Sequence, residues 1–428
     1  MASFCQDGAE QLATGARSTE GNSREGGLTG GPFVIVGGGL AGGNAARTLR
    51  ELGYRDRLVL ITNEPGVPFG RPPLSKTYLR GKESLKGWLV KPADWYEANE
   101  VELVRAAATR LDVAGHRLEL DTGPTVDYAK LLIATGGRNR RFDAPGAELD
   151  GVFQLRTVAD CDAIKAAARS GARAVVVGMG FIGCEVAASL RMLGVDVNAV
   201  FPGKAPLESV LGEKIGEVMT AMHAEHGVEL IAGESVVRFE GAGRVERAVT
   251  KNGRKLECDF AVVAVGIQPN TELLAGTGIG LDNGVLVDGA CRTSVADVYA
   301  AGDVANHLHP LFGRVRVEHY NNAEKQGAAA ARSMLGSDAE YAYLHTFWSD
   351  QYEDKLEYAG HARTWDEFVV RGSMEERKFV GFYLEGGVLK AAVGLNRGGD
   401  PELDADGEMA EAARLIARRA RPRPADLA

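Results

Sequence analysis

The stretch Phe33-Val-Ile-Val-Gly-Gly-Gly-Leu-Ala-Gly42 decides the fold. Its first four residues are apolar and mostly β-branched, which is typical of a buried strand, and a glycine cluster comes directly after them. The next apolar residues recur at helical spacing as far as Gly53. A strand, a glycine-rich turn and a helix in this order predict a unit that binds a dinucleotide.

A second copy of the pattern lies near the middle of the chain. Ala174–Val177 is the apolar run, Gly178-Met-Gly-Phe-Ile-Gly183 is the glycine cluster, and a helical pattern comes next and ends at Gly194. Further apolar runs, each typical of a strand, are Leu58–Ile61, Leu131–Ala134 and Phe260–Val265. Alternating strands and helices predict an α/β fold with two doubly wound, Rossmann-like nucleotide-binding domains.

The two fingerprints differ at the end of the next strand. In the first, Gly37 permits a tight turn, Gly39 lets a pyrophosphate approach the backbone, and Gly42 lets helix and strand pack closely. Glu64 stands at the end of the next strand, where a carboxylate can accept hydrogen bonds from ribose hydroxyls. The corresponding strand end of the second unit reads Val200-Phe-Pro-Gly-Lys204 and offers no carboxylate, which leaves NADH and NADPH both open.

Two nucleotide sites in one chain are useful when they bring two redox rings together. We therefore expect FAD at the first fingerprint and NAD(P)H at the second. Ala300-Ala-Gly-Asp303 is predicted near a helix start, where Asp303 either accepts from the ribityl chain of FAD or only caps the helix.

The predicted domains follow from these cofactors. Residues 31–150 and 272–340 form a discontinuous FAD-binding domain, and residues 151–271 form the NAD(P)-binding domain. Residues 341–428 change to short strand-like segments and a helix near Glu408, which indicates a small C-terminal α+β domain. Residues 1–30 are predicted to be a disordered tail, and Arg418–Pro424 a solvated one.

Several motifs together resemble one family, the FAD-dependent pyridine nucleotide oxidoreductases of the ferredoxin, putidaredoxin and rubredoxin reductase type, which include apoptosis-inducing-factor-like proteins. Besides the two fingerprints, the matching segments are Phe69–Lys76, Leu132–Gly136, Val265–Asn270, Ala301–Asp303, Val317–Tyr320 and Phe347–Tyr352. Related disulfide reductases carry a redox-active Cys just before the position of Lys76, and this chain has none between Cys5 and Cys161. Thiol–disulfide chemistry is therefore not expected.

The resemblance implies roles for individual residues. Lys76 and Glu185 pair near the flavin, Trp348 lies against the isoalloxazine, and Glu318 and Tyr320 lie beside the nicotinamide; Lys76, Glu185 and Trp348 are the residues nearest the chemistry. Arg140 is expected near the FAD diphosphate or adenosine, although Asn139 stands where the family commonly has Pro. The complete set of predicted cofactor contacts is Gly37, Gly39, Leu40, Ala41, Gly42, Glu64, Arg71, Lys76, Thr135, Gly136, Arg140, Gly178, Gly180, Phe181, Ile182, Gly183, Glu185, Gly266, Gly302, Asp303, Glu318, Tyr320 and Trp348.

Composition limits the other possibilities. A formal charge of −9 argues against nucleic acid as the main partner, and no apolar run approaches the roughly 20 residues of a membrane helix. Five scattered cysteines without metal or disulfide spacing favour a reducing cytoplasm. His223-x-x-His226 and His307-x-His309 lack a third ligand nearby, so we expect no metal site.

The expected reaction is hydride transfer from NAD(P)H to FAD, followed by single-electron transfer to a small iron–sulfur protein such as a ferredoxin or rubredoxin. An NAD(P)H oxidase or small-acceptor reductase, and an apoptosis-inducing-factor-like redox sensor with a long-lived charge-transfer complex, are alternatives. A homodimer is compatible with the sequence. The basic residues that form either an acceptor docking patch or a solvated charged face are Arg71, Arg80, Lys82, Lys86, Lys91, Arg314 and Arg316.

Overall fold

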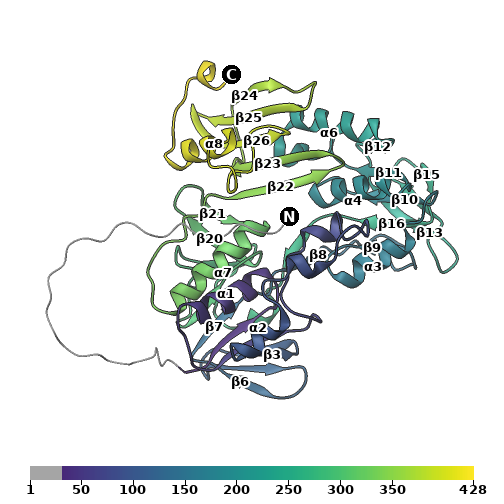
Figure 1. The fold of residues 1–428 in the computed structure, drawn as a ribbon. Coiled ribbons are helices and arrows are strands. Elements are labelled where there is room, and N and C mark those ends of the chain that lie inside the picture. Colours follow the sequence, from purple (N-terminus) through teal and green to yellow (C-terminus); the bar gives the residue numbers. More distant parts are fainter. Residues whose placement is uncertain (1–30) are drawn as a thin grey trace.

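The first fingerprint folds as strand β1 (Phe33–Val36), a glycine turn and helix α1 (Leu40–Glu51) in the computed structural model, which describes residues 31–428. The predicted tail, residues 1–30, lies outside the described residues. β1 is the central strand of a parallel sheet ordered β19-β7-β1-β2-β3, and helix α7 (Tyr320–Met334) packs along α1 (Figure 1). Its other strands are β2 (Leu58–Thr62), β3 (Val101–Arg105), β7 (Lys130–Ile133) and β19 (Val298–Ala300).

The second fingerprint builds a matching unit. β10 (Arg173–Val177) is the central strand of a parallel sheet ordered β12-β11-β10-β16-β9, and it leads into α4 (Phe181–Met192). The other elements are β9 (Val152–Gln154), α3 (Val158–Ala167), β11 (Asp196–Phe201), α5 (Glu208–Leu211), α6 (Glu213–Glu225), β12 (Glu229–Ala232) and β16 (Phe260–Val263). Two parallel sheets with a glycine turn after each central strand confirm the predicted doubly wound α/β fold.

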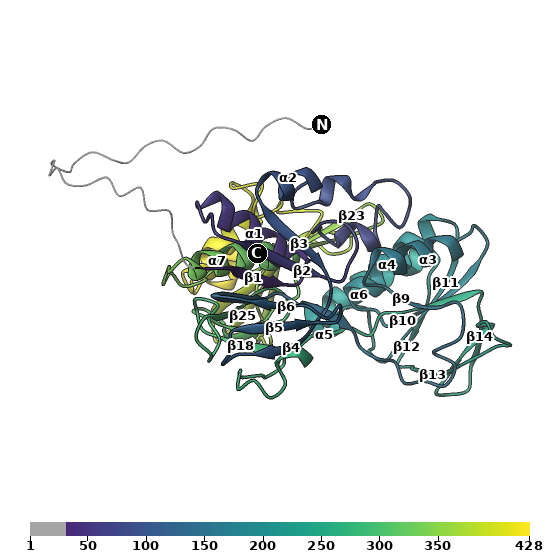
Figure 2. The same cartoon turned by 90° about the horizontal axis from the view of Figure 1, so that it is seen from below.

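Short elements connect and extend these sheets. β8 (Gly137–Asn139) pairs antiparallel with β17 (Ile267–Pro269) where the chain crosses between the two units. Figure 2 shows β13 and β14 at the outer edge of the second unit. The remaining elements up to α7 are η1 (Pro72–Ser75), η2 (Leu85–Trp88), α2 (Ala93–Ala98), β4 (Ala108–Asp112), β5 (Arg117–Leu120), β6 (Thr125–Asp127), β13 (Val236–Glu240), β14 (Arg247–Thr250), β15 (Lys255–Glu257), η3 (Glu272–Leu274), β18 (Val285–Val287), β20 (Ala305–His309) and β21 (Gly313–Arg316).

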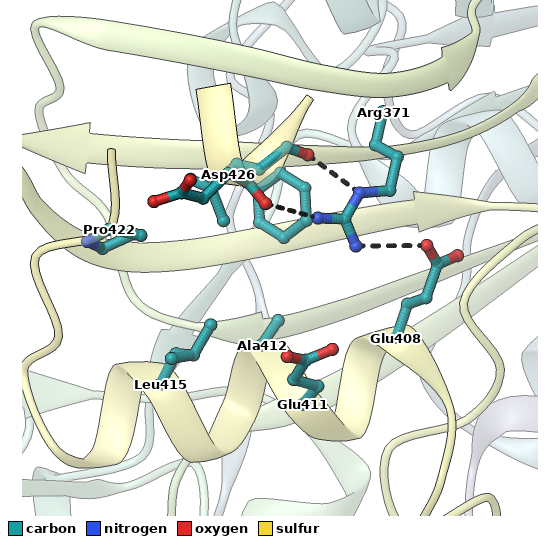
Figure 3. A pocket seen from close by; sticks show the side chains of 9 residues that line it. Arg371, Glu408, Glu411, Ala412, Leu415, Pro422 and Asp426 are labelled. Carbon is teal, nitrogen blue, oxygen red and sulfur yellow. Dashed lines mark hydrogen bonds and ion pairs between the residues drawn. The ribbon is translucent and has the colours of Figure 1, made fainter. Parts of the chain in front are cut away.

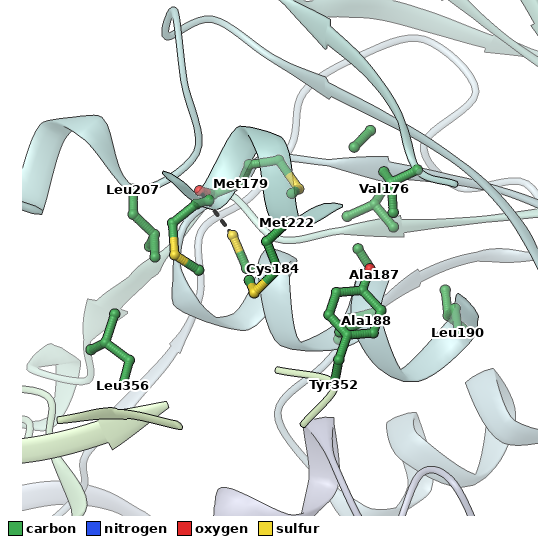
Figure 4. Close-up of a cluster of buried hydrophobic side chains, with 14 of the residues drawn as sticks. Val176, Met179, Cys184, Ala187, Ala188, Leu190, Leu207, Met222, Tyr352 and Leu356 are labelled. Atoms are coloured by element: carbon green, nitrogen blue, oxygen red, sulfur yellow. Dashed lines mark hydrogen bonds between the residues drawn. The ribbon is translucent and has the colours of Figure 1, made fainter. Parts of the chain in front are cut away.

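The C-terminal unit is an antiparallel sheet ordered β22-β23-β26-β25-β24. Its elements are β22 (Thr346–Gln351), β23 (Asp354–Gly360), β24 (Glu367–Ser373), β25 (Lys378–Glu385), β26 (Val388–Leu395), α8 (Glu408–Ala417) and α9 (Pro424–Leu427). One apolar cluster runs from this sheet into the second nucleotide unit: Tyr352 and Leu356 join Cys184 and Met222 in it (Figure 4). Burying this shared surface fixes β22 against α4.

The segment Arg418–Pro424, predicted to be solvated, is mostly exposed, and the residues directly after it pack onto the sheet. Leu427 is 3% exposed, and Arg371 donates to the carbonyl oxygens of Leu427 and Asp426 over 2.9 and 3.0 Å (Figure 3). The same guanidinium pairs with Glu408 of α8 at 3.3 Å. One apolar side chain and two satisfied carbonyls hold Asp426 and Leu427, beside an Arg/Pro-rich segment that stays exposed.

The helix start predicted near Asp303 is wrong. Asp303 lies in a turn between β19 and β20, and β20 continues as a strand that pairs in parallel with β18. Asp303 is therefore no helix cap. Among residues 31–428, no helix has the length and apolar character to span a bilayer.

Candidate active site

The two glycine fingerprints leave two helix N-termini open. Gly39 caps α1 and Gly180 caps α4; neither helix has a side-chain cap or an acidic residue in its first turn. A Cβ added to either glycine meets nothing within 4 Å. Helix N-terminal amides with no partner and a positive local potential suit the oxygens of a diphosphate. Both sites therefore fit a dinucleotide.

The last glycine of each fingerprint is enclosed, in contrast. A Cβ on Gly42 lies 2.0 Å from the carbonyl oxygen of Gly37, and one on Gly183 lies 2.0 Å from that of Gly178. Real Cβ atoms do not approach backbone so closely, so helix and strand pack this tightly only with glycine. The middle glycine faces open space, and the last one serves packing.

Glu64 follows β2, as predicted, and forms an ion pair with Arg71. Both side chains are partly exposed, at 33% and 26%. Arg71 also donates to the carbonyl oxygen of Arg156 over 2.6 Å, so it ties the end of β2 to the segment before α3. Glu64 keeps a second carboxylate oxygen for a ribose hydroxyl.

Asp303 pairs with Arg156, Nη2 to Oδ2, at 2.8 Å. The sequence reasoning missed Arg156, although the Thr157-Val-Ala-Asp160 capping box that starts α3 marks its position. Gly302 donates its N–H to Gln326 of α7 over 2.9 Å, which holds the Asp303 turn at the α1–α7 layer.

Thr135, Gly136 and Arg140 lie where the chain crosses between the two sheets. The Thr135 hydroxyl donates to the carbonyl oxygen of Asn270 over 2.7 Å, and the Arg140 N–H donates to that of Gly266 over 2.9 Å. The structure thus brings two predicted FAD residues next to one segment, Val265–Asn270, that leads out of the second nucleotide unit. Leu40, Ala41, Phe181 and Ile182 lie in the first turns of α1 and α4.

Lys76 and Glu185 form a buried ion pair. Lys76 Nζ lies 2.8 Å from Glu185 Oε2, and the two residues are 7% and 4% exposed. Two hydroxyls complete the carboxylate: Ser75 Oγ donates over 2.5 Å and Ser349 Oγ over 2.8 Å. Sequence reasoning missed both serines, although each stands within a segment that resembles the family. Three donors thus satisfy this carboxylate and offset the cost of its burial.

Three aromatic rings lie close together near the start of η1. Tyr320, the first residue of α7, meets Trp348 edge-on at 5.6 Å between ring centroids and Trp88 at 5.9 Å. A Cβ on Gly70 would lie 2.4 Å from the Tyr320 ring, so the chain before Arg71 approaches this ring closely. Trp348, predicted against the isoalloxazine, and Tyr320, predicted beside the nicotinamide, are in contact in the structure.

Glu318 pairs with Arg316 at 2.7 Å. Burial raises the pKa of the Glu318 carboxyl. The charge of Arg316 opposes this rise in pKa, and the charge of nearby Asp303 adds to it. Arg316 is 7% exposed in its side chain, and Arg314 donates to the carbonyl oxygens of Val287 and Asn306. Arg314 is exposed and Arg316 is paired with Glu318, and whether either belongs to a docking patch stays a prediction.

The first histidine pair is engaged by polar and aromatic neighbours. His223 is buried, with hydrogen bonds to Tyr352 and Gln351, and His226 stacks on Tyr352 at 3.6 Å. Across residues 31–428, no group of three His, Cys, Asp or Glu side chains is placed to hold a metal ion. The hollow beside Arg371 in Figure 3 is lined by the packed C-terminal segment and serves that packing.

Comparisons with known proteins agree with this arrangement. The pyridine nucleotide-disulphide oxidoreductase family model matches residues 31–327, and the reductase C-terminal model matches residues 346–428. The anthranilate 1,2-dioxygenase system ferredoxin–NAD(+) reductase component of Burkholderia cepacia is 38% identical, covering 93% of this chain and 97% of the relative. Rhodocoxin reductase of Rhodococcus erythropolis is 36% identical, covering 85% and 86%. The structure of a covalent putidaredoxin reductase–putidaredoxin complex superposes with a TM-score of 0.88 at 30% identity, covering 93% and 95%.

Proposed function

The chain belongs to the pyridine nucleotide-disulphide oxidoreductase family, and from this premise we propose that it passes electrons from NAD(P)H through FAD to a ferredoxin-type iron–sulfur protein. It is an oxidoreductase, and FAD and NAD(P)H are its cofactors. The observation that carries the proposal is the pair of uncapped helix N-termini together with the buried Lys76–Glu185 pair, in a chain that has no cysteine between Cys5 and Cys161.

Each unit has a place in this proposal. Residues 31–150 and 272–340 bind FAD, with the diphosphate at the α1 N-terminus and ribose at Glu64. Residues 151–271 bind NAD(P)H at the α4 N-terminus. Residues 341–428 form the C-terminal α+β domain and supply Trp348 from β22. Arg140 and Gly266 lie where the two binding units meet.

The residues around the pair position and tune the flavin. When bound, the flavin accepts a hydride and gives up single electrons. The Lys76 ammonium stabilises negative charge on the flavin. The ion pair with Glu185 holds this ammonium in position. Trp348 and Tyr320 present ring surfaces that exclude water. No protein nucleophile is required.

The acceptor follows from the relatives and from surface charge. One relative is named as a ferredoxin–NAD(+) reductase component, and the solved complex joins a reductase to putidaredoxin. Arg80, Lys82 and Lys86 lie on or near the surface close to η1 and η2, and they remain available to steer an acidic partner. Lys91 is engaged by Glu51 and the Trp95 ring.

Rapid mixing of the purified protein tests this function. We expect a visible flavin spectrum, its bleaching by NADH or NADPH without oxygen, and fast reoxidation by an added ferredoxin. Comparing the two nucleotides under equal conditions decides the preferred donor. A reduced flavin that persists in air for minutes and ignores every ferredoxin would refute the acceptor and favour a redox sensor.

The proposal extends to the cell compartment. Cys161, Cys184, Cys258 and Cys291 are all free and buried, as is usual where thiols stay reduced. We therefore place the enzyme in the cytoplasm. Fractionation of the producing cells checks this, because enrichment outside the cytoplasmic fraction would contradict it.

A further inference from the structure

A chain of buried hydrogen bonds leads away from the Glu185 carboxylate. Ser349 Oγ donates to Glu185 Oε1 over 2.8 Å, and Gln351 Nε2 donates to Ser349 Oγ over 3.1 Å. His223 Nε2 lies 3.0 Å from Gln351 Oε1, and His223 Nδ1 lies 3.1 Å from the Tyr352 hydroxyl. This hydrogen-bond chain is continuous from the Tyr352 hydroxyl to the Glu185 carboxylate.

This chain joins three elements from two units. Glu185 lies on α4, His223 on α6, and Ser349 and Gln351 on β22. Successive strand residues face opposite sides, so Ser349 and Gln351 point one way while Trp348 points the other. His223 is fully buried, and both β22 residues are 1% exposed. Water therefore does not substitute for any member of the chain.

The chemistry of the groups sets a single direction of donation. An ionised carboxylate only accepts, so Ser349 donates to it and must itself accept from the Gln351 amide. The amide oxygen of Gln351 then requires a proton on His223 Nε2, which leaves Nδ1 to accept from Tyr352. Burial lowers the pKa of His223 to about 4, so the ring is neutral and carries the one N–H that this direction requires. Every donor in the chain points its positive end toward Glu185.

We propose that His223, acting through Gln351 and Ser349, is a positioning residue that holds Glu185 as the ionised partner of Lys76 while the flavin is reduced. This inference rests on the proposed function, which sets the Lys76–Glu185 pair beside the flavin. An amide does not relay protons readily, so the chain polarises and orients the carboxylate. It thereby fixes the net charge next to the flavin.

Other ionisable groups near the chain are few. Asp350 of β22 is close enough to influence Glu185, and burial raises its pKa while Lys76 opposes that rise. Cys184 of α4 is buried, and Glu185 contributes to its raised pKa. His226, the C-cap residue directly after α6, is the ionisable neighbour of His223. Asp350 and Cys184 stay unchanged in the variants that test the proposal.

The test compares His223→Leu with His226→Leu in the FAD-loaded enzyme. His226 lies at the end of the same helix and touches the same Tyr352 ring, but its Nδ1 bonds only the Met222 carbonyl, outside the chain. Midpoint potential and flavin reduction rate are measured against pH. We expect the pH profiles of both quantities to move up by about one unit in His223→Leu, a tenfold change in proton concentration. His226→Leu should match the wild type.

Two further measurements separate positioning from simple packing. His223→Gln keeps an N–H donor and should restore most of the wild-type pH profile. Nitrogen-15 spectra of the histidine-labelled enzyme, with the His223 signal identified by its loss in His223→Leu, should show protonated Nε2 and bare Nδ1 between about pH 6 and pH 8.

The outcomes are distinct. A protonated Nδ1 in the wild type overturns the inference even if His223→Leu does not fold. So does a His223→Leu enzyme with normal FAD content and an unmoved pH profile. A wild-type protein that binds no FAD, or is not reduced by NAD(P)H, refutes the proposed function instead.

Discussion

At the scale of single residues, ion pairs orient the carboxylates that are predicted to bind ligands. Glu64 is held by Arg71, and Asp303 by Arg156, so each carboxylate is oriented before any ligand arrives. Because the Arg71 guanidinium also holds the Arg156 backbone, the two pairs form one connected group at the predicted FAD site. Orientation of this kind lowers the entropy lost on binding.

We expect Glu64→Ala to weaken FAD binding by about 10- to 100-fold, since a hydrogen bond to a charged group contributes about 1.5–3 kcal/mol. Titration of the apoprotein with FAD measures this. Glu51→Ala is the matched control, because its exposed carboxylate pairs only with the surface residues Arg47 and Lys91. Equal FAD affinity in both variants would rule out the ribose role of Glu64.

Residue-level prediction from the sequence succeeded where a motif carried the residue. The pairing of Lys76 with Glu185 follows from the family resemblance and is present in the structure. Arg156, Ser75 and Ser349 were missed because their partners are distant in sequence, and Ser, Arg and Gln are too common for their positions alone to indicate a contact.

At the scale of elements, each fingerprint glycine has a separate task, and the α4 turn lets these tasks be tested apart. Gly180→Ala adds a Cβ in open space where a pyrophosphate would approach, so we expect normal folding and FAD content. Its KM for NAD(P)H should rise about tenfold or more, a loss of about 1.4 kcal/mol in binding.

Gly183→Ala is the contrasting variant, because its Cβ would lie 2.0 Å from the carbonyl oxygen of Gly178. This Cβ should displace α4 from β10 and lower the free energy of unfolding by about 1–3 kcal/mol. A lower melting temperature would show this loss. Steady-state kinetics and thermal melting of the two proteins settle the assignment. Loss of stability in Gly180→Ala, with NAD(P)H affinity intact, would contradict it.

Elements with strong local patterns were predictable, and elements fixed by tertiary pairing were not. The central strands and the helices after them follow from apolar runs and glycine turns. Val304–His309 reads equally well as a helix start, and only its pairing with β18 and β21 makes it a strand. Leu427 likewise finds its apolar contact only in the folded sheet.

At the scale of the whole molecule, histidines gather where the first unit meets the C-terminal sheet. The rings of His307 and His309 on β20 lie 5.4 and 5.0 Å from that of His345, which precedes β22. All three are 1% exposed, and neither ring nitrogen of His307 or His345 has a hydrogen-bond partner. Such rings fold only in their neutral form.

This junction makes stability depend on pH. Burial lowers the pKa of His307 to about 3 and that of His319 to about 4, and it lowers the pKa of His345 further still. In the unfolded chain, histidine titrates near pH 6.5. Below that pH only the unfolded state takes up these protons, so each such histidine lowers the free energy of unfolding by about 1.4 kcal/mol per pH unit, until its folded pKa is reached.

We therefore expect the protein to lose stability steeply from about pH 6.5 down to about pH 3 and to vary little above that range. His345→Leu removes one proton-binding group without breaking a hydrogen bond, so it should reduce the acid loss by about 1.4 kcal/mol per pH unit. Denaturant unfolding at a series of pH values measures this. His116→Asn, in the β4–β5 turn away from the cluster, should keep the wild-type slope, because Asn tolerates the positive φ of 51° there. A slope unchanged by His345→Leu would mean that water or a local rearrangement accommodates the charged ring at this junction.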